Sequence, residues 1–472
     1  MNAKHSRAAP SPPPLSPRGE GILCNWKMTS HTKTRPWRRA LLWLLFLGPF
    51  FFASYGFATW VTSQRSDVGV VVFAWEYYLI PFWPWTIVPY WFIDLLYGIS
   101  LFMCATRLQL DQHAKRLLTA QVAAVSCFLL FPLHFSFNRG QVEGVFGPMF
   151  ETLALFDKPF NQAPSLHIAL MVLLWVVYLR ALPQAWRWMV HGVFALIGVS
   201  VLTTWQHHFF DVPTGLWLGW FCLWLFPDEM QSPLATAALT RDPARRKLAL
   251  LYGLAALLLA IFAFKMGGAA LWLLWPSGSL ALVALAYLYF GAAAFQKRTD
   301  GSMTPAARWL LAPYLWGAKL NARLWTRGMN MADAVAPGIL LGQLSPHAAL
   351  QHLNVAHIVD VSAELPYRSK AGAYSNIPML DLAPPGVEQI AHAVRAIENA
   401  RPSGTVLVCC ALGFSRSALA VAAWLLGTQR AGSVEDALTQ IRSARPAIVL
   451  GPAHETALHA WWRQHQCGTI RL

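Results

Sequence analysis

A cysteine and an arginine separated by five residues form a pair that could act on a phosphate ester. Cys410 and Arg416 enclose the segment 411–415, and Ser417 follows the arginine. A thiolate is a strong nucleophile, and a guanidinium binds two phosphate oxygens with a planar fork that an ammonium group lacks. Ser417 is placed to donate a hydrogen bond to the sulfur as it leaves. This spacing predicts a covalent phosphoryl-transfer site.

The segments on either side of this pair indicate how a phosphate could be held. The apolar run 405–408 predicts a short buried strand, and the apolar run 418–426 predicts a helix. A loop between a strand and a helix start points backbone N–H groups inward, and the helix dipole adds positive potential. We expect this field to favour the thiolate of Cys410. The expected phosphate-binding residues are Ala411, Leu412, Gly413, Phe414 and Ser415.

The order Cys-(x)5-Arg-Ser resembles the signature of the cysteine-dependent dual-specificity and tyrosine phosphatases, over residues 329–472. The resemblance implies that Cys410, Arg416 and Ser417 are catalytic. The residue before the nucleophile is usually His in that family, whereas here it is Cys409, which could form a protective adduct or be inert. The family also uses a general acid on a preceding loop. The match is Asp381, in NIPMLDLAPP, and Asp360 is its rival.

Two further polar clusters interrupt long apolar runs. Ser165 and His167 lie in APSLHIAL, and His207, His208 and Asp211 lie in TTWQHHFFDVPTG. Because His207 and Asp211 are four residues apart, one helical turn could bring them together. Asp211 could then hold one imidazole nitrogen while the other attacks phosphorus. His167 could protonate the leaving group, and Ser165, at a predicted helix start, could bind phosphate oxygens.

These clusters look like motifs of the type-2 phosphatidic acid phosphatase superfamily, which includes lipid phosphatases, undecaprenyl-diphosphate phosphatases and sphingolipid head-group synthases. Its Pro-Ser-x-His motif matches 164–167, and its His-x-x-x-Asp motif matches 207–211. Arg139 is the nearest match to its Arg-Pro motif, with Gly140 in place of Pro, and Val201 stands where an arginine is usual. The resemblance covers about 85–227 and implies a lipid phosphate site with Arg139 as a phosphate-binding residue. The histidines could instead be structural.

The composition indicates a membrane protein. The chain has 472 residues, of which 56% are hydrophobic and 12% charged, about half the charged share of a typical soluble domain. A membrane-spanning helix needs about twenty apolar residues. Eight candidate spans lie at 40–61, 85–106, 117–135, 166–179, 188–205, 212–227, 248–264 and 269–295.

Basic residues gather in alternate gaps between these runs, and the other gaps hold only Arg65, Arg139, Lys158 and Lys265. Because cytoplasmic loops carry an excess of Lys and Arg, both termini should be cytoplasmic and the histidine cluster should face outward. This bias, with some attraction to anionic lipid, explains the net charge of +15 without a nucleic acid partner. Cys410 would then lie in reducing cytosol, where catalytic thiols belong.

The predicted fold is a polytopic α-helical membrane domain of about eight spans followed by an α/β dual-specificity-phosphatase-like domain. The parts are a disordered basic leader at 1–36, a type-2 phosphatidic acid phosphatase-like domain at 37–230, two further spans at 231–295, a basic amphipathic linker at 296–328 and a cytosolic domain at 329–472. This order is similar to predicted bacterial inner-membrane phosphatases. We expect no cofactor, and no metal, because the histidines are scattered.

Several functions stay open. The Cys410 site could act on lipid phosphates or on phosphotyrosine, and a domain beside the bilayer meets lipid phosphates at high effective concentration. It could also bind phosphorylated partners without turnover. The histidine site could transfer a lipid head group instead of hydrolysing a phosphate. Asp94, alone in the second run, could be functional or structural, whereas His134 and His191 are expected to satisfy local packing.

Overall fold

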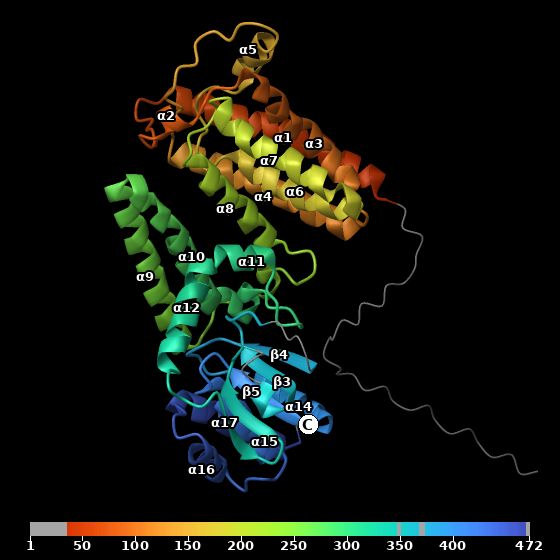
Figure 1. The fold of residues 1–472 in the computed structure, drawn as a ribbon, viewed down its shortest axis with the longest axis vertical. Coiled ribbons are helices and arrows are strands. Elements are labelled where there is room, and N and C mark those ends of the chain that lie inside the picture. The colour runs from red at the N-terminus through yellow and green to blue at the C-terminus, as the bar shows by residue number, and fades with distance from the viewer. Residues whose placement is uncertain (1–34, 347–350, 368–372, 469–472) are drawn as a thin grey trace, which may run out of the picture.

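The computed structural model describes residues 35–346, 351–367 and 373–468. A helical bundle lies at one end of the molecule, an α/β domain lies at the other, and a group of helices connects them (Figure 1). The leader predicted at 1–36 falls almost wholly outside the described residues.

The helical part extends to Trp325. Its helices are α1 (Trp37–Ser63), α2 (Glu76–Leu79), α3 (Ile87–Met103), α4 (Arg107–Leu130), α5 (Gly147–Phe156), α6 (Leu166–Ala181), α7 (Arg187–Thr203), α8 (Asp211–Leu225), α9 (Pro243–Met266), α10 (Leu274–Leu285), α11 (Pro305–Leu310) and α12 (Ala312–Trp325). A short π-helical turn, η5 (Ala286–Phe290), continues α10.

Five helical segments within the described residues, rather than the eight expected, are long and apolar enough to cross a membrane. They are Trp37–Ser63, Pro84–Met103, Gln184–Thr203, Pro243–Met266 and Gly268–Phe295. The other three predicted runs fall on α4, α6 and α8. The helices α6 and α8 have only 16 and 15 residues. The first turns of α4 carry Arg107, Asp111, Lys115 and Arg116, and Arg116 is buried, with its Nε donating to the Phe226 carbonyl at 2.9 Å.

Two glycines on α8 allow that helix to lie close against α6. A Cβ at Gly215 would stand 2.5 Å from the Ser165 carbonyl oxygen, and one at Gly219 would stand 2.8 Å from Val172 Cβ. Small residues four apart let two helix backbones approach in this way. The contact brings the start of α6, with Ser165, against the start of α8, with Asp211.

The α/β domain is built on a five-stranded sheet with the order β1-β2-β5-β3-β4. Only β1 is antiparallel to its neighbour. The main core lies between the sheet and α14 and α15, with α16 and α17 packed beside α15. The elements are β1 (Ala332–Ala336), β2 (Ile339–Gln343), β3 (Val355–Ser362), β4 (Ala373–Met379), α14 (Val387–Ala400), β5 (Thr405–Cys410), α15 (Arg416–Gly427), α16 (Val434–Ala444) and α17 (Pro452–Gln466).

The two parts of the chain are joined by buried polar contacts. Lys297 Nζ donates to Asp360 Oδ2 at 2.6 Å, and both side chains are fully buried. The Tyr287 hydroxyl donates to the Asp381 carbonyl oxygen at 2.9 Å. The segment 296–328, predicted as an amphipathic linker, therefore begins inside this junction and continues as α11 and α12.

Candidate active site

Cys410 ends the central strand β5, and Arg416 begins α15. The Cys410 sulfur accepts hydrogen bonds from the Gly413 amide and the Ser417 hydroxyl, both at 3.3 Å. Among the described residues, no side chain caps the N-terminus of α15. Its first amides and its dipole are therefore directed at the loop, as in anion sites at helix starts. The structure thus brings Cys410, Ser417 and the loop 411–415 together as expected.

Gly413 is required by the shape of this loop. It has φ of +74°, and a Cβ there would lie 2.6 Å from the Gly342 carbonyl carbon on β2. Arg445 supports the same turn from outside, because its Nε donates to the Gly413 carbonyl at 3.1 Å. Its Nη1 also pairs with Asp333 at 2.6 Å. The loop is therefore fixed by β1, β2 and the segment after α16.

Arg416 is held by two carboxylates. Its two terminal nitrogens donate to the two Glu364 oxygens, each at 2.7 Å, and Nη2 lies 2.9 Å from Asp381 Oδ1. Burial alone would raise the pKa of Glu364, but the charge and hydrogen bonds of Arg416 hold it below its usual value. Ionised Glu364 therefore stabilises the fold at neutral pH, and this contribution is lost as the pH falls through the folded-state pKa.

Asp381 has the surroundings of a proton donor. Burial raises the pKa of Asp381, Arg416 opposes this, and the negative charge of Glu364 raises it further. Its side chain is 25% exposed, so it can reach a bound molecule. A carboxyl group that keeps its proton to higher pH is suited to protonate a departing oxygen.

Asp360 is the alternative candidate for the general acid, but both of its carboxylate oxygens already accept hydrogen bonds. Its Oδ2 accepts from Lys297 and Tyr374, and its Oδ1 accepts from the Ser362 amide at 2.8 Å. Cys409 pairs with Asp360 in the sheet register and packs on the opposite face from Cys410. Burial raises the pKa of Cys409 well above its usual value, and Asp360 adds to this. Cys409 is therefore held as a buried neutral thiol.

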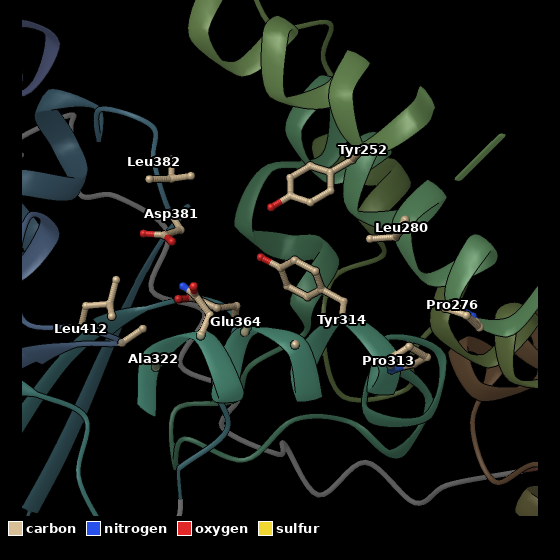
Figure 2. Close-up of a pocket in the computed structure, with 14 residues that line it drawn as sticks. Tyr252, Pro276, Leu280, Pro313, Tyr314, Ala322, Glu364, Asp381, Leu382 and Leu412 are labelled. Atoms are coloured by element: carbon tan, nitrogen blue, oxygen red, sulfur yellow. The ribbon is translucent and has the colours of Figure 1, made fainter. Parts of the chain in front are cut away.

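A cavity of about 430 Å³ adjoins the Cys410 loop and includes residues that the sequence analysis did not identify. Glu364, Asp381 and Leu412 line one side, and Tyr252 and Tyr314 line the other. Figure 2 shows both tyrosine hydroxyls pointing toward Asp381 and Glu364. The sequence indicates Glu364 only weakly, through its position shortly after an apolar run that predicts a strand. The tyrosines belong to distant helices, so no local pattern indicates them.

The second predicted site is also assembled in part. His207 Nδ1 lies 3.1 Å from Asp211 Oδ2, and His207 Nε2 lies 3.2 Å from Ser165 Oγ. His167 lines the same small cavity of about 50 Å³ as His207. Its ring stacks on Tyr90 with centroids 4.2 Å apart, and its Nε2 has no hydrogen-bond partner among the described residues.

Carboxylates line the cavity beside His207, whereas the sequence predicts the phosphate-binding cation Arg139 there. Asp94 and Asp157 line this cavity, and Asp157 accepts from Tyr55 at 2.6 Å and from Tyr90 at 3.1 Å. Arg139 does not line it: its guanidinium donates to the carbonyls of residues 204 and 205 and lies over Phe150. Asp157 lies in a loop outside the matched motifs, so no local pattern in the sequence indicates it.

Three further histidines of the helical part, His208, His134 and His191, make local contacts. His208 Nδ1 lies 3.0 Å from the buried carboxylate of Glu76. His134 Nδ1 contacts the Gly69 carbonyl at 3.0 Å, and His191 accepts from Trp175 at 3.1 Å. These contacts agree with a packing role for His134 and His191.

Comparisons with known proteins concern the α/β domain. A family described as "Dual specificity phosphatase, catalytic domain" matches residues 341–464. Dual specificity protein phosphatase 26 of Bos taurus is 30% identical in an alignment of 151 positions that covers 29% of this chain and 71% of that protein. Dual specificity protein phosphatase Mpk3 of Drosophila melanogaster is 31% identical over 123 residues, 24% of this chain and 30% of that protein.

Solved structures of dual specificity phosphatases also resemble part of the chain. Human DUSP28 is 25% identical, covers 29% of this chain and 96% of its own, and has a TM-score of 0.26. A mouse putative dual specificity phosphatase complexed with zinc tungstate is 25% identical, covers 30% and 94%, and has a TM-score of 0.28.

Proposed function

The chain belongs to the dual specificity phosphatase family through its carboxy-terminal domain, and we propose that Cys410 hydrolyses phosphate monoesters beside a membrane through a covalent phosphate intermediate. The observation that carries this proposal is the buried group formed by Cys410, Ser417 and Arg416, with the partly exposed Asp381 beside it. The sulfur accepts two hydrogen bonds, and the guanidinium contacts the candidate general acid at 2.9 Å.

The reaction has two balanced steps. The Cys410 thiolate forms a bond to phosphorus, the bond from phosphorus to the alcohol oxygen breaks, and Asp381 gives its proton to that oxygen. Water then attacks phosphorus, passes a proton to Asp381, and releases the thiolate and inorganic phosphate. Arg416 and the amides of 411–415 bind the equatorial oxygens in both steps. Ser417 stabilises the sulfur as it leaves.

Turnover of phenyl phosphate by the purified full-length protein tests this function, with His207→Ala present throughout so that the predicted histidine site contributes nothing. We expect phosphate release that Cys410→Ser abolishes and that Asp381→Asn reduces by roughly 100-fold. Cys409→Ser is the matched control, because its sulfur lies on the other face of the sheet. Activity that survives in Cys410→Ser would contradict the mechanism. A phosphopeptide that binds without any turnover would favour the alternative of a phosphate-binding sensor.

A second function is supported by the Ser165–His207–Asp211 arrangement. The orientation of His207 by Asp211 resembles the activated histidine of the type-2 phosphatidic acid phosphatases, and His167 lies beside it as a candidate acid. We therefore propose a lipid phosphate site in the helical bundle. Because Asp94 and Asp157 line the cavity and Arg139 is engaged elsewhere, head-group transfer remains an alternative to hydrolysis.

Labelled lipid phosphate in vesicles distinguishes these outcomes. Hydrolysis by this site releases free phosphate from the Cys410→Ser protein, whereas transfer converts the labelled lipid to another lipid. Either activity should be lost in His207→Ala and retained in His191→Ala. The His191 ring contacts the Trp175 indole and lies outside the predicted site. Equal activity in both variants would exclude His207 from catalysis.

The proposed location is a bacterial inner membrane, with both termini cytoplasmic and the His207 site facing outward. Five helices of sufficient length and apolarity support a membrane location. The two sites lie toward opposite ends of α8: His207 precedes its start, whereas Trp224 near its end donates to the Ala294 carbonyl beside the α/β junction. Membrane lipids and a phosphorylated lipid or protein are the expected partners.

A further inference from the structure

The cavity beside Cys410 is shared between the α/β domain and three helices of the other part of the chain. Pro276 and Leu280 come from α10, Tyr252 comes from α9, and Tyr314 and Gly317 come from α12. The helices α9 and α10 are both candidate membrane spans. The cavity therefore connects the start of the 411–415 loop, at Leu412, with these helices (Figure 2).

The lining of the cavity changes in character with distance from Leu412 on the loop. Next to the loop are the carboxylates of Glu364 and Asp381, and facing them are the hydroxyls of Tyr252 and Tyr314. The two tyrosine rings pack edge to face with centroids 5.9 Å apart. Beyond them the lining is apolar, with Pro276 and Leu280. A phosphate ester of an amphiphilic alcohol fits these surroundings. Its phosphate would lie at the loop, its polar part beside the carboxylates and hydroxyls, and its apolar part beside Pro276 and Leu280.

The outer surface of the same helices is apolar. On α12, Trp316, Leu320 and Leu324 are 62%, 58% and 63% exposed, and the neighbouring Lys319 and Arg323 are also exposed. Exposed apolar groups of this size indicate a binding surface. Aromatic and aliphatic residues bordered by basic ones are typical of helices in the membrane interface. The basic residues favour anionic lipids at this position.

We propose that this cavity is a lipid-binding site that admits a membrane phosphate monoester laterally from the bilayer to Cys410. The inference rests on the proposed function of Cys410 and narrows its substrate class to lipid phosphates. Tyr252 and Tyr314 are specificity-determining residues that bind the polar part of the leaving alcohol. The apolar chain lies against α10 and leaves the cavity toward the lipid that contacts α9 and α12.

The test uses full-length protein in phosphatidylcholine vesicles, with His207→Ala present throughout so that the other site contributes nothing. Substrates are phosphatidic acid in the vesicles, glycerol 3-phosphate as the soluble head group, a phosphotyrosyl peptide and phenyl phosphate. We expect the highest kcat/KM for phosphatidic acid. A higher value for the peptide, or an equal value for glycerol 3-phosphate, would overturn the inference.

Gly317→Trp tests the cavity directly. A Cβ at Gly317 meets no atom of the described residues within 4 Å, so the indole can enter the cavity without displacing the backbone. We expect the ratio of kcat/KM for phosphatidic acid to that for phenyl phosphate to fall roughly tenfold. Leu320→Trp, on the outer face of α12, is the matched control and should keep the ratio. An unchanged ratio in Gly317→Trp would overturn the inference.

Tyr314→Phe provides a second variant that keeps the ring in place. Loss of one hydroxyl contact should lower the same ratio by roughly fivefold, whereas Tyr289→Phe, outside the cavity, should not. These measurements distinguish an error in the proposed function of Cys410 from an error in the proposed lipid-binding site. If phenyl phosphate is not turned over and Cys410→Ser changes nothing, the proposed function is wrong. If phenyl phosphate is turned over but neither variant alters the ratio, only the lipid site is wrong.

Discussion

At the residue scale, the pairing of Arg416 explains how a buried guanidinium can be tolerated and used. Its side chain is 1% exposed, and Glu364 satisfies both terminal nitrogens. A buried charge without such a partner would be strongly destabilising. Glu364 therefore acts as a positioning residue, because it fixes the plane of the guanidinium beside Cys410. It also raises the pKa of the neighbouring Asp381 through its charge.

We predict that Glu364→Gln moves the alkaline limb of the kcat–pH profile to lower pH. Activity that needs protonated Asp381 falls as the pH rises through the pKa of that carboxyl. Removing the charge of Glu364 lowers this pKa, and closer pairing of Arg416 with Asp381 lowers it further. We also expect kcat to fall on the order of tenfold to 100-fold, because Arg416 loses its bidentate partner.

Phenyl phosphate suits this measurement, because its leaving oxygen needs protonation. The control is Asp381→Asn, which has no titrating carboxyl and should lack the alkaline limb altogether. His454 also faces Asp381 and is kept in both variants. A limb that stays in place or moves to higher pH in Glu364→Gln would contradict the assignment of Asp381 as the acid.

Cys409 and Cys410 should differ sharply in reactivity although they are adjacent. Cys409 is fully buried, and its pKa is raised by burial and by Asp360, so it lacks the reactive thiolate. We predict that iodoacetate inactivates the native protein by alkylating Cys410, and that it does not alkylate Cys409. Iodoacetate should inactivate Cys409→Ser at the wild-type rate. Mass spectrometry of the peptide that contains positions 409 and 410 identifies the alkylated cysteine. Alkylation at Cys409 in the folded protein would contradict this prediction.

At the element scale, the buried pair Lys297–Asp360 fixes β3 to the segment after α10. Lys297 Nζ also donates to the Ser362 carbonyl at 2.9 Å, so the lysine satisfies the carboxyl end of the strand that precedes Glu364. Since the cavity has walls from both parts of the chain, this contact also determines how α10 and α12 lie relative to Arg416.

We predict that Lys297→Met destabilises the α/β domain by about 3 kcal/mol, because it leaves Asp360 buried without its cation. Thermal inactivation of phenyl phosphate turnover in detergent would report this as a lower midpoint temperature. The double variant Lys297→Met/Asp360→Asn should recover part of the loss, since the asparagine carries no charge. If the double variant is no more stable than Lys297→Met, the pair does not stabilise this junction.

The elements differ in how far the sequence predicts them. The loop from Cys410 to Ser417 is contiguous, so its strand, turn and helix follow from local pattern. The pairing of Arg416 with Glu364 joins residues 52 positions apart, and the approach of Tyr252 and Tyr314 joins separate helices, which no local pattern encodes. Two of the eight predicted spans fall on α6 and α8, which are short helices packed against each other, where apolarity reflects packing as well as lipid contact.

At the scale of the whole molecule, charge is distributed unevenly between the two ends of the bundle. Arg39 at the start of α1 pairs with Asp111 at the start of α4, and Arg298 pairs with Glu229 next to the α/β domain. In the described residues, the loops around the His207 cluster carry the basic residues Arg65, Arg139 and Lys158. An excess of Lys and Arg is typical of the cytoplasmic side of a membrane, so the charge pattern favours a cytoplasmic α/β domain.

Cysteine labelling in sealed right-side-out vesicles tests this orientation. Cys467 is exposed on the α/β domain, and Val145, between α4 and α5 on the His207 side, is 83% exposed. In a chain with Cys24→Ser, we predict that a membrane-impermeant maleimide labels Val145→Cys in sealed vesicles and labels Cys467 only after detergent is added. The membrane would then separate the two thiols, as the charge distribution predicts. Labelling of Cys467 before detergent at the rate of Val145→Cys would place the Cys410 domain outside and contradict the orientation.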